Sequence, residues 1–402
     1  MKLVRYLFLL LSMSATAANI TPGHYRATLQ LAEQVELPFH LEIKLQAGEP
    51  VLLISNAEDR FVVDDIHYTH DTLVAKMPEF DTELQFVAKG SQLSGVWINH
   101  YRTTDNSIPF SANLTAEALF KNTAPAAFAY EGQWEVYFGQ DEAKTPAIGV
   151  FRKGTKTNEV YGTFLTETGD YRFLEGCVSG KELWLACFDG NHAYLFHAVL
   201  QDDGSLKGSF RSGRHYQETW TARRNADFKL RDPENISFVK KDTPIAFTFK
   251  NLKGETVALS DERYKNKPVI IQLMGSWCPN CLDESRYLSA LYKQYQAKGL
   301  EVVAICFEKS EDFEKSQAQV SRMATRTGIT YQVLLSGKSG KNAATLALPW
   351  LSEVAAFPTT IFLNRAHQAV KVHTGFSGPA TGEVYAAFTR HTEQFIEQLI
   401  RE

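Results

Sequence analysis

The chain has 402 residues, of which 44% are hydrophobic and 22% charged, a globular composition with enough apolar material for more than one core. Its 42 Lys and Arg residues are outnumbered by 46 Asp and Glu residues, so the net charge of −4 provides no basic field to hold nucleic acid or an anionic membrane. Five cysteines are too few for a small scaffold stapled by disulfides.

The N-terminus has the order of a secretory signal. Lys2 and Arg5 precede an apolar run over residues 6–13, and small residues follow at 15–18. The run is far shorter than the ~20 residues that cross a bilayer. We therefore expect a signal peptide over 1–18, cleaved after Ala17 or Ala18, and an exported protein without a membrane span, in the periplasm if the source is Gram-negative.

Residues 19–222 show short runs of alternating polarity separated by turn residues, a pattern typical of antiparallel β structure. The segment also contains an internal repeat, carried by Gly23-His24-Tyr25 and Gly132-Gln133-Trp134, Pro38 and Pro146, Leu93-Ser94-Gly95 and Leu206-Lys207-Gly208, and His100-Tyr101 and His215-Tyr216. Each half has room for about five strands, so we expect one all-β antiparallel barrel or sandwich of about ten strands built by duplication.

A charged stretch without periodicity, residues 223–242, predicts a linker. Beyond it, strands and helices alternate over residues 243–402. This order predicts an α/β domain whose sheet contains parallel strands and carries helices on both faces. Its expected strands cover 269–273, 301–307, 331–335 and 359–363, and its expected helices cover 281–298, 312–327, 342–351 and 381–402.

Two cysteines stand where the first of these strands meets a helix, in the sequence Trp277-Cys278-Pro279-Asn280-Cys281. Unpaired backbone N–H groups and the helix dipole favour a thiolate at the helix N-terminus, so Cys278 is the expected nucleophile. Cys281 lies one helical turn further on and can resolve a mixed disulfide. Zinc would need two more ligands, and no second Cys-x-x-Cys occurs. We expect a redox-active cysteine pair, with no metal or other cofactor.

The segments Phe247–Gly254, Val269–Leu273, Trp277–Cys281 and Phe357–Leu363 resemble the TlpA/ResA-type thioredoxin-fold disulfide reductases. The resemblance implies that Pro358 is cis and packs against the cysteine pair, and that the backbone at Phe357 pairs with an extended substrate. Trp277 and Thr359 are the other expected substrate contacts. The family further implies protein disulfides as substrates and an exported or membrane-bound thiol protein as electron donor.

The sequence departs from thioredoxin at one position. Thioredoxin has a buried Asp six residues before its first cysteine, whereas this chain has Gln272, which cannot move a proton. Glu284 matches the carboxylate of the ResA-like branch and is a candidate base for Cys281. In the alternative interpretation, Glu284 is a surface residue of the first helical turn that only complements the helix dipole.

The other three cysteines have no predicted catalytic role. Cys306 lies in an apolar strand and is expected to pack in the core. If Gly180-Lys181 is a two-residue hairpin loop, Cys177 faces Trp184 and Cys187 points to the opposite face of the sheet. This register disfavours a disulfide between Cys177 and Cys187.

The sequence therefore predicts an exported thiol-disulfide oxidoreductase acting as a reductase. One alternative is a binding protein whose thioredoxin-like domain is a docking or redox-sensing module, and another is a thiol peroxidase. The β region shows no catalytic constellation. We expect it to hold a partner protein or a small apolar ligand near Cys278.

Overall fold

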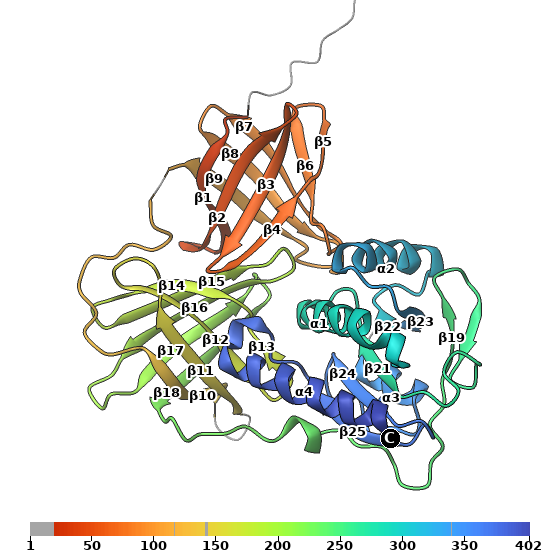
Figure 1. Ribbon diagram of the computed structural model, residues 1–402. Coiled ribbons are helices and arrows are strands. Elements are labelled where there is room, and N and C mark those ends of the chain that lie inside the picture. The colour runs from red at the N-terminus through yellow and green to blue at the C-terminus, as the bar shows by residue number, and fades with distance from the viewer. Residues whose placement is uncertain (1–19, 116, 141–143, 339) are drawn as a thin grey trace, which may run out of the picture.

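The computed structural model describes residues 20–402 except 116, 141–143 and 339. The chain forms three bodies: two β domains from its N-terminal half and an α/β domain from its C-terminal part (Figure 1). The predicted signal peptide lies outside the described residues. None of the described helices combines the length and the apolar composition needed to cross a membrane.

The first β domain is an antiparallel sheet with the strand order β4-β3-β2-β1-β9-β8-β7-β6-β5. The sheet curls around an apolar interior, in which Phe110 contacts Phe39 and Phe86 with ring centroids 6.3 and 5.6 Å apart. Its strands are β1 (Gly23–Ala32), β2 (Val35–Gln46), β3 (Glu49–Asn56), β4 (Asp59–Val63), β5 (Asp65–Thr69), β6 (Thr72–Lys76), β7 (Thr82–Lys89), β8 (Gln92–Asn99) and β9 (Ser107–Leu114).

The second β domain has the order β11-β10-β18-β17-β16-β15-β14-β12-β13, and an additional pairing of β11 with β12 closes it into a barrel. Aromatic rings fill the interior, with Phe164 in contact with Phe138, Phe196 and Trp220. Its strands are β10 (Gly132–Phe138), β11 (Thr145–Lys153), β12 (Glu159–Thr166), β13 (Gly169–Asp170), β14 (Leu174–Ser179), β15 (Glu182–Phe188), β16 (Ala193–Leu200), β17 (Leu206–Ser212) and β18 (Tyr216–Arg224).

The two β domains share the features that the sequence repeat predicts. Gly23 and Gly132 open the first strand of each domain with φ of 147° and 103°. Two residues later, Tyr25 Oη and Trp134 Nε1 each donate to the carbonyl oxygen four residues earlier, at 2.6 and 2.9 Å. The repeat therefore corresponds to two similar nine-stranded sheets.

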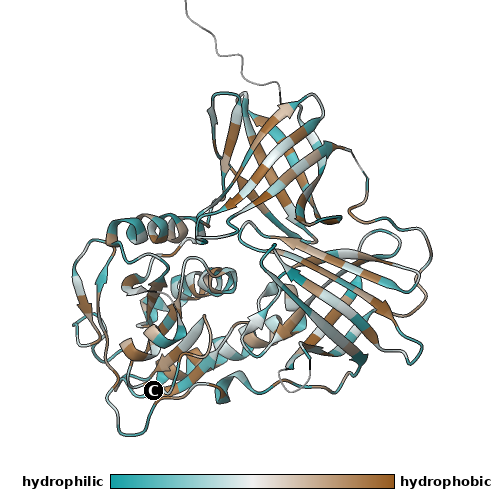
Figure 2. Ribbon diagram, turned by 180° about the vertical axis from the view of Figure 1, so that it is seen from behind, coloured by the Kyte–Doolittle hydropathy of each residue, from teal (hydrophilic) through white to brown (hydrophobic). Residues whose placement is uncertain are grey.

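The all-β class of the N-terminal region is confirmed, but the expectation of one ten-stranded barrel is wrong. Connections of only a few residues leave room for nine strands in each half instead of five. About eight strands already enclose an interior that side chains can fill, so each half buries its own core. In Figure 2 brown and teal residues alternate along the strands of both domains, as curled sheets with an apolar inside require.

The α/β domain has a seven-stranded sheet of order β20-β19-β23-β22-β21-β24-β25, in which β21, β22 and β23 are parallel. In chain order its elements are β19 (Thr248–Asn251), β20 (Thr256–Ala258), β21 (Val269–Met274), α1 (Pro279–Tyr295), β22 (Glu301–Glu308), α2 (Phe313–Thr327), β23 (Gln332–Lys338), α3 (Lys341–Ala347), β24 (Thr359–Leu363), β25 (Ala369–Thr374) and α4 (Glu383–Arg401). All four predicted strands and all four predicted helices are present. The sequence reading missed the β19–β20 hairpin and β25.

Successive side chains of a strand point to opposite faces of the sheet. Because the strands of this sheet carry apolar side chains on both faces, helices cover both. Ile270 and Met274 of β21 belong to one apolar cluster with α1, α2 and α4. Ile271 and Leu273 belong to another cluster, which includes α3. The sandwiched sheet holds the N-terminus of α1 at the carboxyl end of β21, and this is where the cysteine pair lies.

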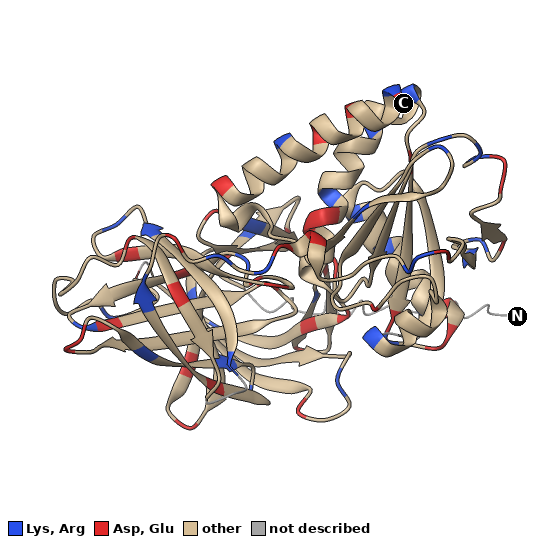
Figure 3. Ribbon diagram, turned by 90° about the horizontal axis from the view of Figure 1, so that it is seen from below, with Lys and Arg blue, Asp and Glu red and all other residues tan. Residues whose placement is uncertain are grey.

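The three bodies pack against one another through apolar and polar contacts. The Phe188 ring of the second β domain meets the rings of Phe39 and Trp97 in the first, with centroids 4.5 and 5.4 Å apart. The side chain of Asn56 in the first β domain donates to and accepts from the backbone of Phe188 in the second, both at 2.9 Å. Gln319 of α2 donates to the carbonyl oxygen of Glu79 at 3.0 Å, and Arg286 of α1 forms an ion pair with the Glu79 side chain. Figure 3 shows residues of both charges scattered over all three bodies, consistent with the balanced composition.

Candidate active site

Cys278 and Cys281 form a disulfide at the start of α1, with Cα atoms 5.2 Å apart. Cys278 is the N-cap residue of the helix, and the backbone N–H of Cys281 points to its sulfur at 3.2 Å. Cys278 retains 7% of its surface exposed, whereas Cys281 is fully buried. A substrate can therefore reach the sulfur of Cys278. The sulfur of Cys281 is accessible only to a mixed disulfide already formed on Cys278.

The loop before β24 packs directly against Cys278. The bond between Phe357 and Pro358 is cis, as predicted. The carbonyl oxygen of Phe357 lies 3.6 Å from the Cys278 sulfur. The backbone at Phe357, where the resemblance implies substrate pairing, is therefore next to the reactive sulfur.

Glu284 is buried under the cysteine pair, with 2% of its surface exposed. Its carboxylate accepts hydrogen bonds from Gln272 Nε2 at 2.8 Å and Thr360 Oγ1 at 2.7 Å. Burial raises the pKa of this carboxyl to about 7, although the two hydrogen bonds act in the opposite direction. The alternative of an exposed first-turn residue is wrong, because this face of α1 packs on the sheet.

Gln272 of β21 is fully buried and fixes the orientation of Glu284. Besides donating to Glu284, its amide oxygen accepts from Ser285 Oγ at 3.1 Å and lies 3.4 Å from Tyr331 Oη. The strand position that holds an Asp in thioredoxin here carries the neutral partner of a carboxylate supplied by the helix. The sequence named Gln272 only as a departure and gave no role for it.

Trp277 lies beside the cysteine pair between the loops. Its ring N–H donates to the carbonyl oxygen of Phe307 at 2.9 Å, and its ring meets that of Phe357 edge to face. Lys309 Nζ lies 4.4 Å above the Trp277 ring centroid, a cation–π contact. Trp277 is thus held in place on one side of Cys278.

Thr359 differs from the expectation of a substrate contact. Its side chain is fully buried, and its hydroxyl donates to the carbonyl oxygen of Ala356 at 2.8 Å. The side chain therefore braces the loop that precedes β24 and does not face the substrate side.

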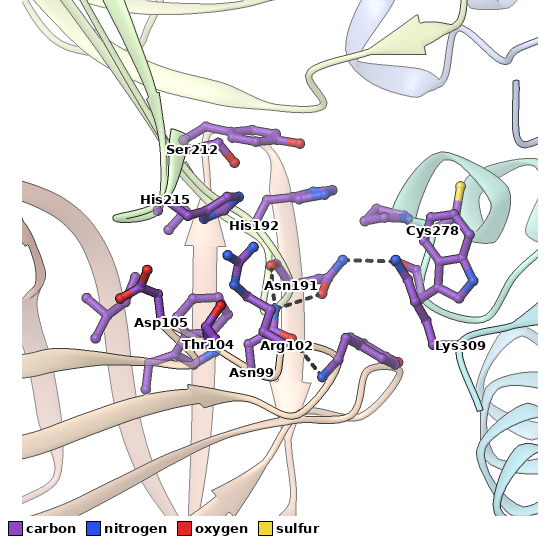
Figure 4. Close-up of a pocket in the computed structure, with 18 of the residues that line it drawn as sticks. Asn99, Arg102, Thr104, Asp105, Asn191, His192, Ser212, His215, Cys278 and Lys309 are labelled. Carbon is purple, nitrogen blue, oxygen red and sulfur yellow. Dashed lines mark hydrogen bonds between the residues drawn. The ribbon is translucent and has the colours of Figure 1, made fainter. Parts of the chain in front are cut away.

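A cavity of about 530 Å³ opens in front of Cys278, between the α1 N-terminus and both β domains. Figure 4 shows Cys278 and Lys309 on one side and Arg102 and His215 on the other. The first β domain contributes Trp97, Asn99, Tyr101–Asp105 and Ile108, and the second contributes Asn191–Tyr194, Ser212, Gly213 and His215. Sequence reasoning missed these turn residues. Only the repeated His100-Tyr101 and His215-Tyr216 pairs marked two of the turns involved.

One chain of hydrogen bonds crosses all three bodies at this cavity. Asn99 Nδ2 lies 3.4 Å from Asn191 Oδ1, and Asn191 Nδ2 donates to the carbonyl oxygen of Trp277 at 2.9 Å. The link reaches the residue immediately before Cys278, so both β domains help to position the start of α1.

The second β domain anchors the two residues between the cysteines, and its Arg172 holds the first of them, Pro279. Its guanidinium donates to the carbonyl oxygen of Pro279 at 3.1 Å and to Asp283 at 2.8 Å. It also contacts Asp59 of the first β domain at 3.2 Å and Asp189 at 3.8 Å. Burial disfavours the charge, but these three carboxylates outweigh it and keep the pKa of Arg172 above its ordinary value.

The second β domain also holds the other residue between the cysteines, since Asn280 donates to the carbonyl oxygen of Asp170 at 3.1 Å.

The remaining cysteines are free thiols and buried. Cys177 pairs with Trp184 across the hairpin, which confirms the predicted register. Burial raises the pKa of the Cys177 and Cys306 thiols, so neither is a reactive nucleophile. Within the described residues, no group of His, Cys, Asp and Glu is arranged to hold a metal ion.

Comparisons with known proteins place the C-terminal part of the chain. A family model described as Redoxin matches residues 239–387. The thiol-disulfide oxidoreductase ResA of Halalkalibacterium halodurans is 27% identical over 131 residues, covering 33% of this chain and 66% of that protein. The thioredoxin-like protein YneN of Bacillus subtilis is 33% identical over 129 residues, covering 32% of this chain and 68% of that protein. The chain therefore spans about two thirds of the length of these relatives.

Among solved structures, the chain is similar to a thiol:disulfide interchange protein DsbE from Chlorobium tepidum, with 20% identity, a TM-score of 0.31, and coverage of 40% of this chain and 98% of that one. The site geometry agrees with the sequence relatives, because the disulfide lies at the N-terminus of α1 and the loop with the cis proline lies next to it. The chain belongs, through its C-terminal domain, to the ResA/TlpA-like family of thioredoxin-fold thiol-disulfide oxidoreductases.

Proposed function

We propose that this protein is an exported reductase of protein disulfides. The observation that carries the proposal is the layered arrangement of the site. Cys278 faces the cavity, Cys281 lies behind it, and the buried carboxyl of Glu284 follows one helical turn further along α1. Export rests on the signal-like N-terminal sequence.

The reaction is a two-electron exchange. The thiolate of reduced Cys278 attacks one sulfur of the substrate disulfide, and the other sulfur leaves as a thiolate that takes up a proton. Cys281 gives its proton to Glu284 and attacks the Cys278 sulfur, which expels the second substrate sulfur as a thiolate and leaves the Cys278–Cys281 disulfide. The thiolate takes up a proton and Glu284 releases the one it accepted. An exported or membrane-bound dithiol protein then returns two electrons and two protons to the pair.

The surroundings of Cys278 support the reducing direction. Its sulfur has the N–H of Cys281 at 3.2 Å, but it also faces the carbonyl oxygen of Phe357 at 3.6 Å. Because the helix N-terminus favours the Cys278 thiolate while this carbonyl oxygen opposes it, the thiolate gains only moderate stabilisation. Such a dithiol is a better reductant than one whose thiolate is strongly stabilised. We therefore expect a reduction potential nearer to that of thioredoxin, about −270 mV, than to that of the oxidant DsbA, about −120 mV.

Two measurements on the full chain test the proposal. Equilibration of the Cys278/Cys281 couple in glutathione buffers gives its potential, and a value above about −150 mV would contradict the reductase direction. Second, the Cys281→Ala variant should retain substrates as mixed disulfides on Cys278, because the resolving thiol is missing. The Cys278→Ala variant is the matched control and should trap nothing; equal trapping by both variants would overturn the assigned order of attack.

A further inference from the structure

The cavity in front of Cys278 has an unbalanced set of charges. The described residues that line it include the cations Arg102 and Lys309, the imidazoles of His192 and His215, and a single carboxylate, Asp105. The cations come from separate parts of the chain, since Arg102 follows β8 in the first β domain and Lys309 follows β22. The fold thus brings positive charge from two domains to one opening beside the reactive sulfur.

These cations form no ion pair with the residues that the structure describes. Neither Arg102 nor Lys309 takes part in the ion pairs formed by the described residues, although Arg286 and Arg326 on the nearby helices do. The Nε of Arg102 is buried and has no hydrogen-bond partner among the described residues. A buried donor without a partner carries a desolvation cost that an incoming acceptor would remove.

The neighbouring carboxylates offset this charge only in part. Glu308 precedes Lys309 but accepts hydrogen bonds from the backbone N–H and the hydroxyl of Ser276, at 2.8 and 2.6 Å. Asp105 is exposed. Lys309 and His215 are exposed as well. Desolvation and the charge of Arg102 lower the pKa values of both groups, while Glu308 opposes this shift at Lys309 and Asp105 opposes it at His215.

From this geometry we propose that the cavity is a subsite for anionic groups, and that the protein prefers disulfides whose substituents carry carboxylates next to the sulfur atoms. The proposal rests on the thiol-disulfide exchange described above and adds its substrate class. Arg102 and Lys309 are the binding residues. A carboxylate would accept hydrogen bonds from Arg102 while the disulfide meets Cys278 across the cavity (Figure 4).

This subsite gives the expected role of the β region a more specific form. The sequence predicted a module that holds a partner protein or a small apolar ligand near Cys278. Beside apolar side chains such as Trp97 and Ile108, the cavity presents Arg102 from the first β domain and two imidazoles from the second. The β domains then select substrates by charge, because they supply Arg102 and the two histidines.

The test uses the reduced full-length protein in single turnovers with three small disulfides of different charge: oxidised glutathione (anionic), 2-hydroxyethyl disulfide (neutral) and cystamine (cationic). Acid quenching, alkylation and mass measurement give the fraction of protein oxidised at each time. The readout is the rate with each charged disulfide divided by the rate with the neutral one, so a loss of active protein cancels out of the ratio.

In the Arg102→Gln and Lys309→Gln variants the anionic-to-neutral ratio should fall about fivefold, and in the double variant at least tenfold, while the cationic-to-neutral ratio rises. The matched control is Lys181→Gln, which also removes one positive charge. Lys181 precedes β15, whereas the cavity residues Asn191 and His192 follow the opposite end of that strand. It should leave both ratios unchanged. Equal ratios in wild type and double variant would overturn the subsite. Failure of the wild type to react with any of the three disulfides would overturn the proposed function itself.

Two peptides of equal length, each with one cystine flanked by Glu or by Lys, identify the source of the anionic group. Preference for the Glu peptide, lost in the double variant, assigns the subsite to acidic segments of protein substrates. Charge preference limited to the small disulfides assigns it to a free anionic disulfide. Absence of charge preference in both series contradicts the proposal.

Discussion

Gln272 and Glu284 meet in the interior beneath the cysteine pair, with the amide nitrogen of Gln272 2.8 Å from a carboxylate oxygen of Glu284. The strand residue supplies a neutral donor and the helix residue supplies the titratable group. Because the carboxyl is buried, its pKa rises to about 7, where it can accept a proton and release it again near neutral pH. The titratable carboxyl beneath the cysteine pair thus lies on α1 in this protein, and β21 contributes a neutral amide.

The Glu284→Gln variant should lose the neutral inflection in the pH dependence of the resolving step. In the wild type the carboxyl becomes a competent base as the pH rises through about 7, so the rate of resolution increases there. In the variant the increase should follow only the ionisation of Cys281, at higher pH. The measurement is the release of a chromophoric thiol from a mixed disulfide formed on Cys278, between pH 5 and 9. The exposed first-turn residue Glu383 provides the control, since Glu383→Gln should keep the wild-type profile.

Glu284 should also make stability depend on pH. The carboxyl has a pKa of about 7 in the folded protein against 4.5 ordinarily, so between these values the folded state binds more protons than the unfolded state. Its contribution is therefore fully present below pH 4.5 and is lost as the pH rises through 7, by about 3 kcal/mol. Urea unfolding of the oxidised protein gives the free energy of unfolding at pH 5 and at pH 8. The decrease between these two pH values should be smaller in Glu284→Gln than in the wild type, by about this amount. The same loss in both proteins would contradict the buried ionisation.

Replacing Gln272 by Leu should move the neutral inflection to higher pH. The variant loses the hydrogen bond that stabilises the ionised form of Glu284, so the pKa of the carboxyl should rise by about one unit. The same chromophore assay reports the shift. A variant that only disturbed packing would change the rate at every pH and leave the inflection near 7.

Arg172→Gln should destabilise the contact between the domains. The substitution leaves the buried carboxylates of Asp283 and Asp189 without their shared cation, a loss of about 3 kcal/mol or more. Calorimetry should show a decrease in Tm of about 5–10 °C. Arg390→Gln, which breaks only an exposed pair with Glu383, should change Tm by less than about 2 °C. Equal effects of the two substitutions would show that Arg172 does not bind the bodies together.

Iodoacetamide should modify the reduced protein chiefly at Cys278. This sulfur is partly exposed at a helix N-terminus, whereas Cys281 and Cys306 are fully buried. Peptide mapping after limited alkylation gives the distribution, and its pH dependence should show a thiol pKa below the free value of about 8.5. Equal modification of Cys281 would contradict the assignment of the nucleophile.

The sequence determined the local features of this protein. Alternation of polarity identified the β region, and the change of rhythm after residue 242 identified the strands and helices of the α/β domain. Cys278 at the start of a helix and Pro358 before a strand were recognisable because spacing along the chain fixes their place in these elements. The repeat showed that the β region has two similar halves.

Tertiary structure decided the rest, because it depends on which surfaces pack together. Burial of Glu284 follows from the face of α1 that meets the sheet, and this burial raises the pKa of the carboxyl to about 7. The nine-stranded closure of each half depends on pairings between strands distant in sequence. The cavity joins Arg102, His192 and Lys309 from turns of three bodies, and no spacing along a chain encodes such a meeting. The unbalanced charge of the cavity arises only when the domains pack together, because Arg102 and Lys309 belong to different bodies.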